Sequence, residues 1–133
     1  MTPTRVLLEE KLTHSVIGAF YKVYRWFGFG FLESVYANAL QRELEKRGHL
    51  VEREVAFVIY YEGDKVGLHR LDMVVDRLLV VETKSSQTLP PFARRQLLSY
   101  LRAAGMQVGL VLHFGPEPKV YREIWTFPTR KPA

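Results

Sequence analysis

The stretch His69–Tyr100, HRLDMVVDRLLVVETKSSQTLPPFARRQLLSY, decides the fold that we expect for this chain. Aliphatic runs lie on both sides of Asp76-Arg77, a pair typical of a turn, and they predict strands over Val66–Val75 and Leu78–Lys84. Two consecutive prolines then end the extended segment and favour the start of a helix, which we expect over Phe92–Ala104. The stretch therefore predicts two paired strands followed by a crossover helix.

Helix and strand patterns continue on both sides of this stretch. Apolar residues recur every three or four positions over Leu7–Trp26, and a second helix is expected to begin just after Gly30. The other expected strands are Val51–Tyr61, with both faces covered, Val108–Phe114, and Lys119–Phe127 at a sheet edge. The order α-α-β-β-β-α-β-β predicts an α/β fold with a mixed central sheet.

Composition narrows the class of protein. We expect the 133 residues to form a single domain, 1–133, with 128–133 as a frayed tail. The absence of cysteine excludes disulfides, cysteine zinc sites and thiol nucleophiles, and it fits a cytoplasmic protein. No apolar run approaches the ~20 residues of a membrane span, and charged residues interrupt any signal peptide at 9–11. The net charge of +5 favours polyanionic partners such as nucleic acid.

Three charged residues interrupt the apolar strands: Asp72, Glu82 and Lys84. Charged groups beside a buried strand cost free energy unless they are paired or bind a cation. Two converging carboxylates suit a hard divalent cation, of which magnesium is the best candidate, and a water on such a cation can act as a nucleophile. Lys84 could orient that water or stabilise a phosphoryl oxygen. For Glu82 and Lys84 taken alone, a structural ion pair is the better interpretation.

The spacing of Asp72 and Glu82 restricts the length of the turn between their strands. A two-residue turn at Asp76-Arg77 would place Asp72 opposite Val81, and Asp72 and Glu82 would then point to opposite faces of the sheet. Both can serve one metal ion only if the turn holds an odd number of residues or the hairpin carries a bulge. We therefore predict an irregularity between Asp72 and Glu82.

The expected crossover helix adds four further candidates. Arg94 and Arg95 lie near its N-terminus, where a phosphate is favoured. Gln96 and Tyr100 are four residues apart and therefore lie on one face of the helix. Structure and function are equally good interpretations of Gln96, and a half-buried core position is the commoner role for a tyrosine such as Tyr100.

At this point the motifs resemble a known group of enzymes. Asp72, followed ten residues later by Glu82-Thr83-Lys84, resembles the core of the PD-(D/E)XK nuclease superfamily. The segment Gln96–Tyr100 resembles the QxxxY motif of its RecB-like branch, and Gly30–Tyr36 fits the GxxExxY signature of a small family in the same superfamily. Leu71 replaces the proline of the superfamily's name, and Phe29 replaces a proline common in the GxxExxY loop.

The resemblance implies a restriction-endonuclease-like αβββαβ core with an extra N-terminal helix. It implies that Asp72 and Glu82 bind Mg²⁺ or Mn²⁺, with the Thr83 carbonyl as a third ligand. It also implies that Glu33 completes the acidic cluster and that Lys84 is the catalytic lysine. The remaining implied residues, Gln96 and Tyr100, hold the site or the substrate from the crossover helix.

Three functions remain open on the sequence. The first is a metal-dependent nuclease, acting on DNA as the best candidate substrate. The second is a non-catalytic module on the same fold that binds nucleic acid or protein, and the third is a nuclease active only in a larger assembly. The first requires Glu33, Asp72, Glu82 and Lys84 to converge on one pocket. A homodimer through the aromatic residues at 20–31 is a further expectation.

Overall fold

A computed structural model describes residues 3–126, with side chains from residue 9 onward. The elements are α1 (Pro3–Phe27), α2 (Glu33–Lys46), β1 (Val51–Tyr61), β2 (Asp64–Val75), β3 (Leu79–Lys84), α3 (Ala93–Ala104), β4 (Val108–Phe114) and β5 (Pro118–Ile124). The predicted order of helices and strands is confirmed. The tail predicted at 128–133 and the end of the last predicted strand, Phe127, lie outside the described residues.

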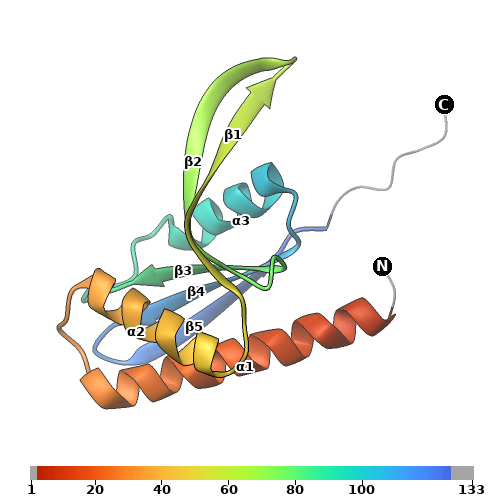
Figure 1. The fold of residues 1–133 in the computed structure, drawn as a ribbon. Helices are drawn as coiled ribbons and strands as arrows, with labels where there is room; N and C mark the ends of the chain where they lie inside the picture. The colour runs from red at the N-terminus through yellow and green to blue at the C-terminus, as the bar shows by residue number, and fades with distance from the viewer. Residues whose placement is uncertain (1–2, 127–133) are drawn as a thin grey trace.

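The five strands form one mixed sheet in the order β1-β2-β3-β4-β5. Only the central pair β3–β4 is parallel, because α3 carries the chain across the sheet between these two strands. The other pairs are antiparallel neighbours in the sequence. Helices α1 and α2 lie on one side of the sheet and α3 on the other (Figure 1). The predicted α/β class is confirmed, with β5 at one edge as expected.

The core has two halves because side chains alternate along the central strands. Val81 belongs to the cluster under α1 and α2, together with Met73 and Leu110. Val80 belongs to the cluster under α3, together with Leu97. The continuous aliphatic run in β3 is therefore explained by burial on both faces, as parallel neighbours and covering helices require.

The hairpin formed by β1 and β2 extends far beyond the body of the sheet (Figure 1). Its outer half has no helix over it, and Tyr60 and Tyr61 are each 65% exposed. The expectation that Val51–Tyr61 is covered on both faces is therefore wrong. The apolar residues do form a strand, but this strand is longer than the helices that could cover it.

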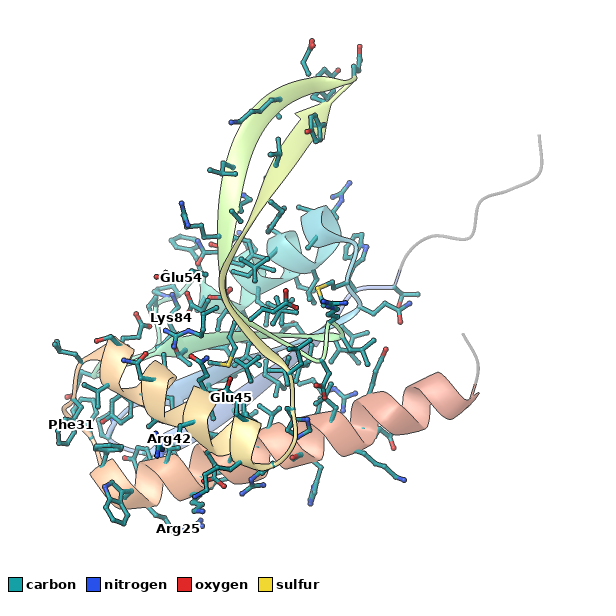
Figure 2. All side chains as sticks on the ribbon, viewed as in Figure 1. Arg25, Phe31, Arg42, Glu45, Glu54 and Lys84 are labelled. Atoms are coloured by element: carbon teal, nitrogen blue, oxygen red, sulfur yellow. The ribbon has the colours of Figure 1, made fainter. Side chains whose placement is uncertain are left out.

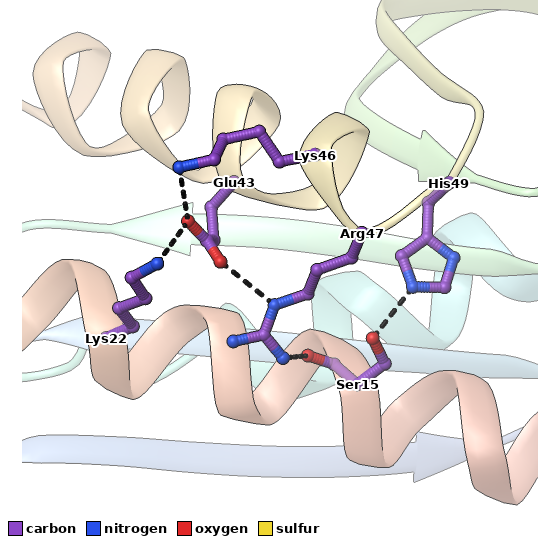
Figure 3. Close-up of polar contacts among 6 residues, drawn as sticks. All are labelled: Ser15, Lys22, Glu43, Lys46, Arg47 and His49. Carbon is purple, nitrogen blue, oxygen red and sulfur yellow. Dashed lines mark hydrogen bonds and ion pairs between the residues drawn. The ribbon is translucent and has the colours of Figure 1, made fainter.

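A polar clasp fixes the end of α2 against α1 (Figure 3). The Glu43 carboxylate accepts from Lys22 at 3.0 Å and from the Arg47 Nε at 3.0 Å, and both contacts lower its pKa. The Arg47 Nη1 donates to the Ser15 carbonyl at 3.1 Å. Arg47 passes close over Gly18, where a Cβ would lie 3.0 Å from that nitrogen. These contacts join the C-terminal part of α2 to α1.

The start of α2 is fixed by a buried tyrosine. The Tyr36 hydroxyl donates to the Gly28 carbonyl and accepts from the Phe31 backbone N–H at 3.3 Å. Its ring stacks on Phe114 of β4 at a centroid distance of 4.2 Å. Gly30 adopts φ +117° in the loop between the helices, a conformation that favours glycine. Tyr36 therefore holds the loop that delivers Glu33 to the sheet.

Candidate active site

The turn between β2 and β3 has the geometry that two cooperating carboxylates require. Val75 pairs with Leu79 and Met73 pairs with Val81, so the turn holds three residues, 76–78. An odd turn places Asp72 opposite Glu82. The predicted irregularity is thus present, and it takes the form of a longer turn rather than a bulge. Positive φ angles at Asp76 and Arg77, +52° and +56°, accommodate the extra residue.

Asp72 and Glu82 lie where the regular β2–β3 ladder ends. The last backbone pair is Met73 with Val81. Beyond it the side chains take over: the Asp72 carboxylate accepts from the Thr83 N–H at 3.1 Å, and the Glu82 carboxylate accepts a long contact from the Asp72 N–H at 3.4 Å. Each carboxylate thus satisfies a backbone donor of the opposite strand, and these contacts bring the two acidic groups together.

The electrostatics of Glu82 are unfavourable for a lone buried carboxylate. The residue is 5% exposed. Burial is the main cause that raises its pKa from 4.5 to about 9; the side-chain hydrogen bond and the charge of Asp72 also raise the pKa, while the Asp72 N–H contact and Lys84 lower it. Without a cation, Glu82 is therefore protonated at neutral pH. A bound divalent cation would favour the ionised form of both carboxyl groups.

Lys84 and Glu33 approach the carboxylate pair from two directions. Lys84 follows Glu82 by two residues on β3, and among the described side chains it forms no direct ion pair. Glu33 begins α2, and its pKa is raised by burial and by Asp72 and lowered by Lys84. The two residues therefore share one electrostatic site with Asp72. The Ser85 hydroxyl, next to Lys84, donates to the Phe31 carbonyl at 2.7 Å and so joins β3 to the loop before Glu33.

A small open cavity of about 170 Å³ leads into this site. Glu33, Asp72 and Thr83 all line it, whereas the buried Glu82 is not among its lining residues. Within the described part of the chain, no three histidine or acidic side chains are grouped closely enough to hold a metal ion. Of the four residues predicted to converge on one pocket, Glu33 and Asp72 line this cavity, whereas Glu82 and Lys84 do not.

Glu54 also lines this cavity, and sequence reasoning missed it. It occupies the position of β1 opposite Asp72, between the pairs Arg53–Met73 and Val55–Leu71, and adopts φ +51°. Figure 2 labels Glu54 where the hairpin leaves the body of the sheet. A sequence signal was available, because Glu54 is a charged residue within a predicted apolar strand, like Asp72 and Glu82.

The α3 candidates separate into two groups. Tyr100 is close enough to Glu82 and Asp72 for their charges to raise its pKa, with burial as the larger cause, and its ring lies 5.0 Å from that of His69. Arg94 is instead paired with Glu123 of β5 at 2.6 Å and lies over Tyr121. Arg95 and Gln96 are exposed, and no described contact joins them to the acidic residues.

These features define a class of enzyme fold. A sequence model of the PD-(D/E)XK nuclease superfamily matches residues 10–124, which include every element described from α2 to β5. The chain belongs to this superfamily. Its members are nucleases that in general use divalent metal ions.

A solved structure shows the same fold. The crystal structure of a protein named SSO0001 superposes with a TM-score of 0.56 at 20% sequence identity, over 95% of this chain. The match covers 63% of the SSO0001 chain, so the present chain spans less than two thirds of that protein. No curated protein sequence matches the chain. No helix among the described residues is long and apolar enough to cross a membrane.

Proposed function

We propose that this chain is a metal-dependent nuclease that hydrolyses phosphodiester bonds of DNA in a single catalytic domain. The observation that carries the proposal is the cross-strand pair at the end of the β2–β3 ladder. Asp72 and Glu82 stand opposite each other, and Lys84 follows on the same strand without a direct ion pair among the described side chains. A purely structural role for Glu82 would leave a buried, protonated acid beside a second acid with no packing benefit.

The donor set fits a hard divalent cation. Carboxylate oxygens are the ligands that Mg²⁺ and Mn²⁺ prefer, and magnesium is held by one or two carboxylates while keeping several waters. Asp72 and Glu82 would hold the cation, with the Thr83 carbonyl as a further ligand. When bound, it would lower the pKa of a water and neutralise charge on the phosphate.

The side chains around this pair have distinct roles in the proposed reaction. Lys84 orients the attacking water and stabilises negative charge on the phosphoryl oxygen. Glu33, which lines the cavity with Asp72, would complete the acidic cluster around the cation, and Glu54 adds a further carboxylate to the same cavity. Tyr100 holds the substrate from α3, next to the acidic pair. Roles for Gln96 and Arg95 in contacting the phosphate backbone stay predictions, and Arg94 would first have to leave Glu123.

We also infer that the chain belongs to the GxxExxY family in the RecB-like branch. The three signature residues each serve the site, because Gly30 takes a positive φ, Glu33 lines the cavity, and Tyr36 holds the loop. The location of Tyr100 beside Glu82 and Asp72 supports the QxxxY part. A homodimer and a cytoplasmic location stay predictions.

The test compares metal binding with cleavage. Calorimetry with Mg²⁺ and Mn²⁺ on the wild type should show binding that Asp72→Asn abolishes, since the amide retains shape but loses charge. Cleavage of single- and double-stranded DNA should require the metal and fall by at least about 100-fold in Asp72→Asn and in Lys84→Ala. Asp64→Asn is the matched control, because it makes the same change on the same strand at an exposed position. Wild-type protein that binds no metal, even with DNA present, would refute the proposal.

The second candidate is a binding module without catalysis. It is favoured by one observation, the lack of three grouped metal-ligating side chains among the described residues. In that case DNA binding would be independent of metal and unchanged in Asp72→Asn. Metal binding without cleavage would instead point to the third function, a nuclease that needs a partner.

A further inference from the structure

The tip of the β1–β2 hairpin is an exposed surface of defined chemistry. Glu62 and Gly63 form its turn with φ angles of +49° and +85°, a tight geometry that matches the twist of paired strands. Glu62 and Asp64 are both exposed carboxylates. Four large apolar side chains beside them are at least half exposed: Tyr60, Tyr61, Val66 and Leu68. The exposed Lys65 follows Asp64, so the tip is a narrow, largely apolar projection with two carboxylates and one ammonium group, and its net charge is negative.

A groove between α1 and α2 has the opposite charge. Its cavity of about 520 Å³ is lined by apolar side chains of both helices, and Trp26 at its side is 83% exposed. The charged residues lining the groove are Lys22, Arg42, Lys46 and Glu43. The Glu43 carboxylate is already shared by Lys22, Lys46 and Arg47, so the groove has a cationic excess.

The two surfaces lie at opposite ends of the molecule. Figure 2 places Arg25 and Arg42, on the two helices that form the groove, far from the hairpin tip. A copy of the chain therefore cannot insert its tip into its own groove. An interaction between the two surfaces has to join different copies head to tail, which is a heterologous contact that forms a ring or an open chain.

We propose that the chain self-associates by inserting the hairpin tip of one copy into the α1–α2 groove of the next. Both surfaces combine exposed aromatic rings with charge, and the charges are of opposite sign, which gives a contact both hydrophobic area and orientation. The interaction buries Tyr60 or Tyr61 against Trp26, while Glu62 and Asp64 meet Arg42 and Lys46. This association does not depend on the proposed nuclease activity, because it uses no residue of the cavity at Asp72.

Paired charge reversals test the contact without metal or DNA. The tip variant is Glu62→Lys with Asp64→Lys, and the groove variant is Arg42→Glu with Lys46→Glu; all four residues are exposed, so folding should be retained. Sedimentation velocity over a series of concentrations should show association of the wild type that weakens with added salt. Each variant alone should be monomeric at concentrations where the wild type associates.

Mixing the two variants is the decisive measurement. The mixture restores opposite charges in both directions, tip to groove and groove to tip, so equimolar variants should associate again. Thermal unfolding and far-UV circular dichroism verify that each variant is folded. The proposal is overturned if the wild type stays monomeric at all concentrations, if either variant associates as the wild type does, or if the mixture stays monomeric. An oligonucleotide that binds the groove of a monomeric wild type would also overturn it, and would assign the groove to nucleic acid.

Discussion

The β1–β2 and β2–β3 hairpins of this sheet share strand β2 but differ in their surroundings. In the β2–β3 hairpin, Met73 and Val81 are fully buried under α1 and α2, and Val80 is fully buried on the α3 face. In the outer half of the β1–β2 hairpin, Leu68 is 50% exposed and Tyr61 is 65% exposed. The aliphatic and aromatic pattern is similar in both, so burial is set by the reach of the helices and not by the pattern of the strands.

The candidate site lies at the boundary between these two regions. Asp72 is the first residue of β2 beyond the last backbone pair with β3, and Glu54 faces it on β1 with a positive φ. A strand that leaves its neighbour exposes backbone donors, and here the carboxylates of Asp72 and Glu82 accept from them. The buried β2–β3 hairpin, called the enclosed hairpin below, holds the two carboxylates in place. The cavity lies where strand β2 separates from β3 and continues into the exposed β1–β2 hairpin.

The largest expected effect is a difference in the free energy of unfolding between substitutions in the buried half and in the exposed half of β2. Met73→Ala removes a fully buried side chain and should lower the free energy of unfolding by about 2–5 kcal/mol. Leu68→Ala, on the exposed part of the same strand, should change it by no more than about 0.5 kcal/mol. Urea unfolding of both variants measures the difference. Equal costs would mean that the hairpin is packed against something else in solution.

An intermediate effect concerns the pH dependence of the enclosed hairpin. Glu82 has a pKa of about 9 in the folded protein, against 4.5 as its ordinary value, so between these values the folded state holds a proton that the unfolded chain releases. The contribution of Glu82 to metal-free stability should therefore be fully present below pH 4.5 and should be lost as the pH rises towards 9.

Glu82→Gln has no group to ionise at this position, so its stability should lack this pH dependence. At pH 9, with a chelator that removes metal ions, its free energy of unfolding should exceed that of the wild type by roughly 1–3 kcal/mol. Thermal melts from pH 4 to pH 9 measure it. Added Mg²⁺ should raise the melting temperature of the wild type and not that of Glu82→Gln. A wild-type profile parallel to that of the variant would show that Glu82 is already ionised without metal.

The smallest effect concerns the turns of the two hairpins. The Asp76 carboxylate accepts from the Leu50 N–H at 2.8 Å and contacts the His49 ring at 2.7 Å, so it ties the β2–β3 turn to the end of α2. Asp76→Asn keeps an oxygen and a residue suited to positive φ, and should cost about 1 kcal/mol through its weaker contacts. Asp64→Asn at the free tip should cost nothing measurable. Urea midpoints compare them, and a silent Asp76→Asn would mean that the turn is fixed by its backbone alone.

Much of the fold could be predicted because its signals are local. Strands Val51–Tyr61 and Val108–Phe114 match their predicted bounds, since glycine, proline and charged residues delimit the apolar runs. The separation of Arg94 from the site could not be predicted in this way. Helix periodicity places Arg94 near the N-terminus of α3, but its partner Glu123 comes from β5, 29 residues away in the sequence.

The sequence by itself determined the superfamily, the order of elements and the identity of the charged residues, and the parity of Asp72 and Glu82 required either an odd turn or a bulge. These properties depend on residue type and on spacing along one or two neighbouring strands. Only the tertiary structure decided that Glu54 joins the cavity, that the β1–β2 hairpin extends uncovered, and that Tyr36 fixes the loop before Glu33. Each of these depends on how elements far apart in the sequence pack against one another, and no local sequence pattern encodes that packing.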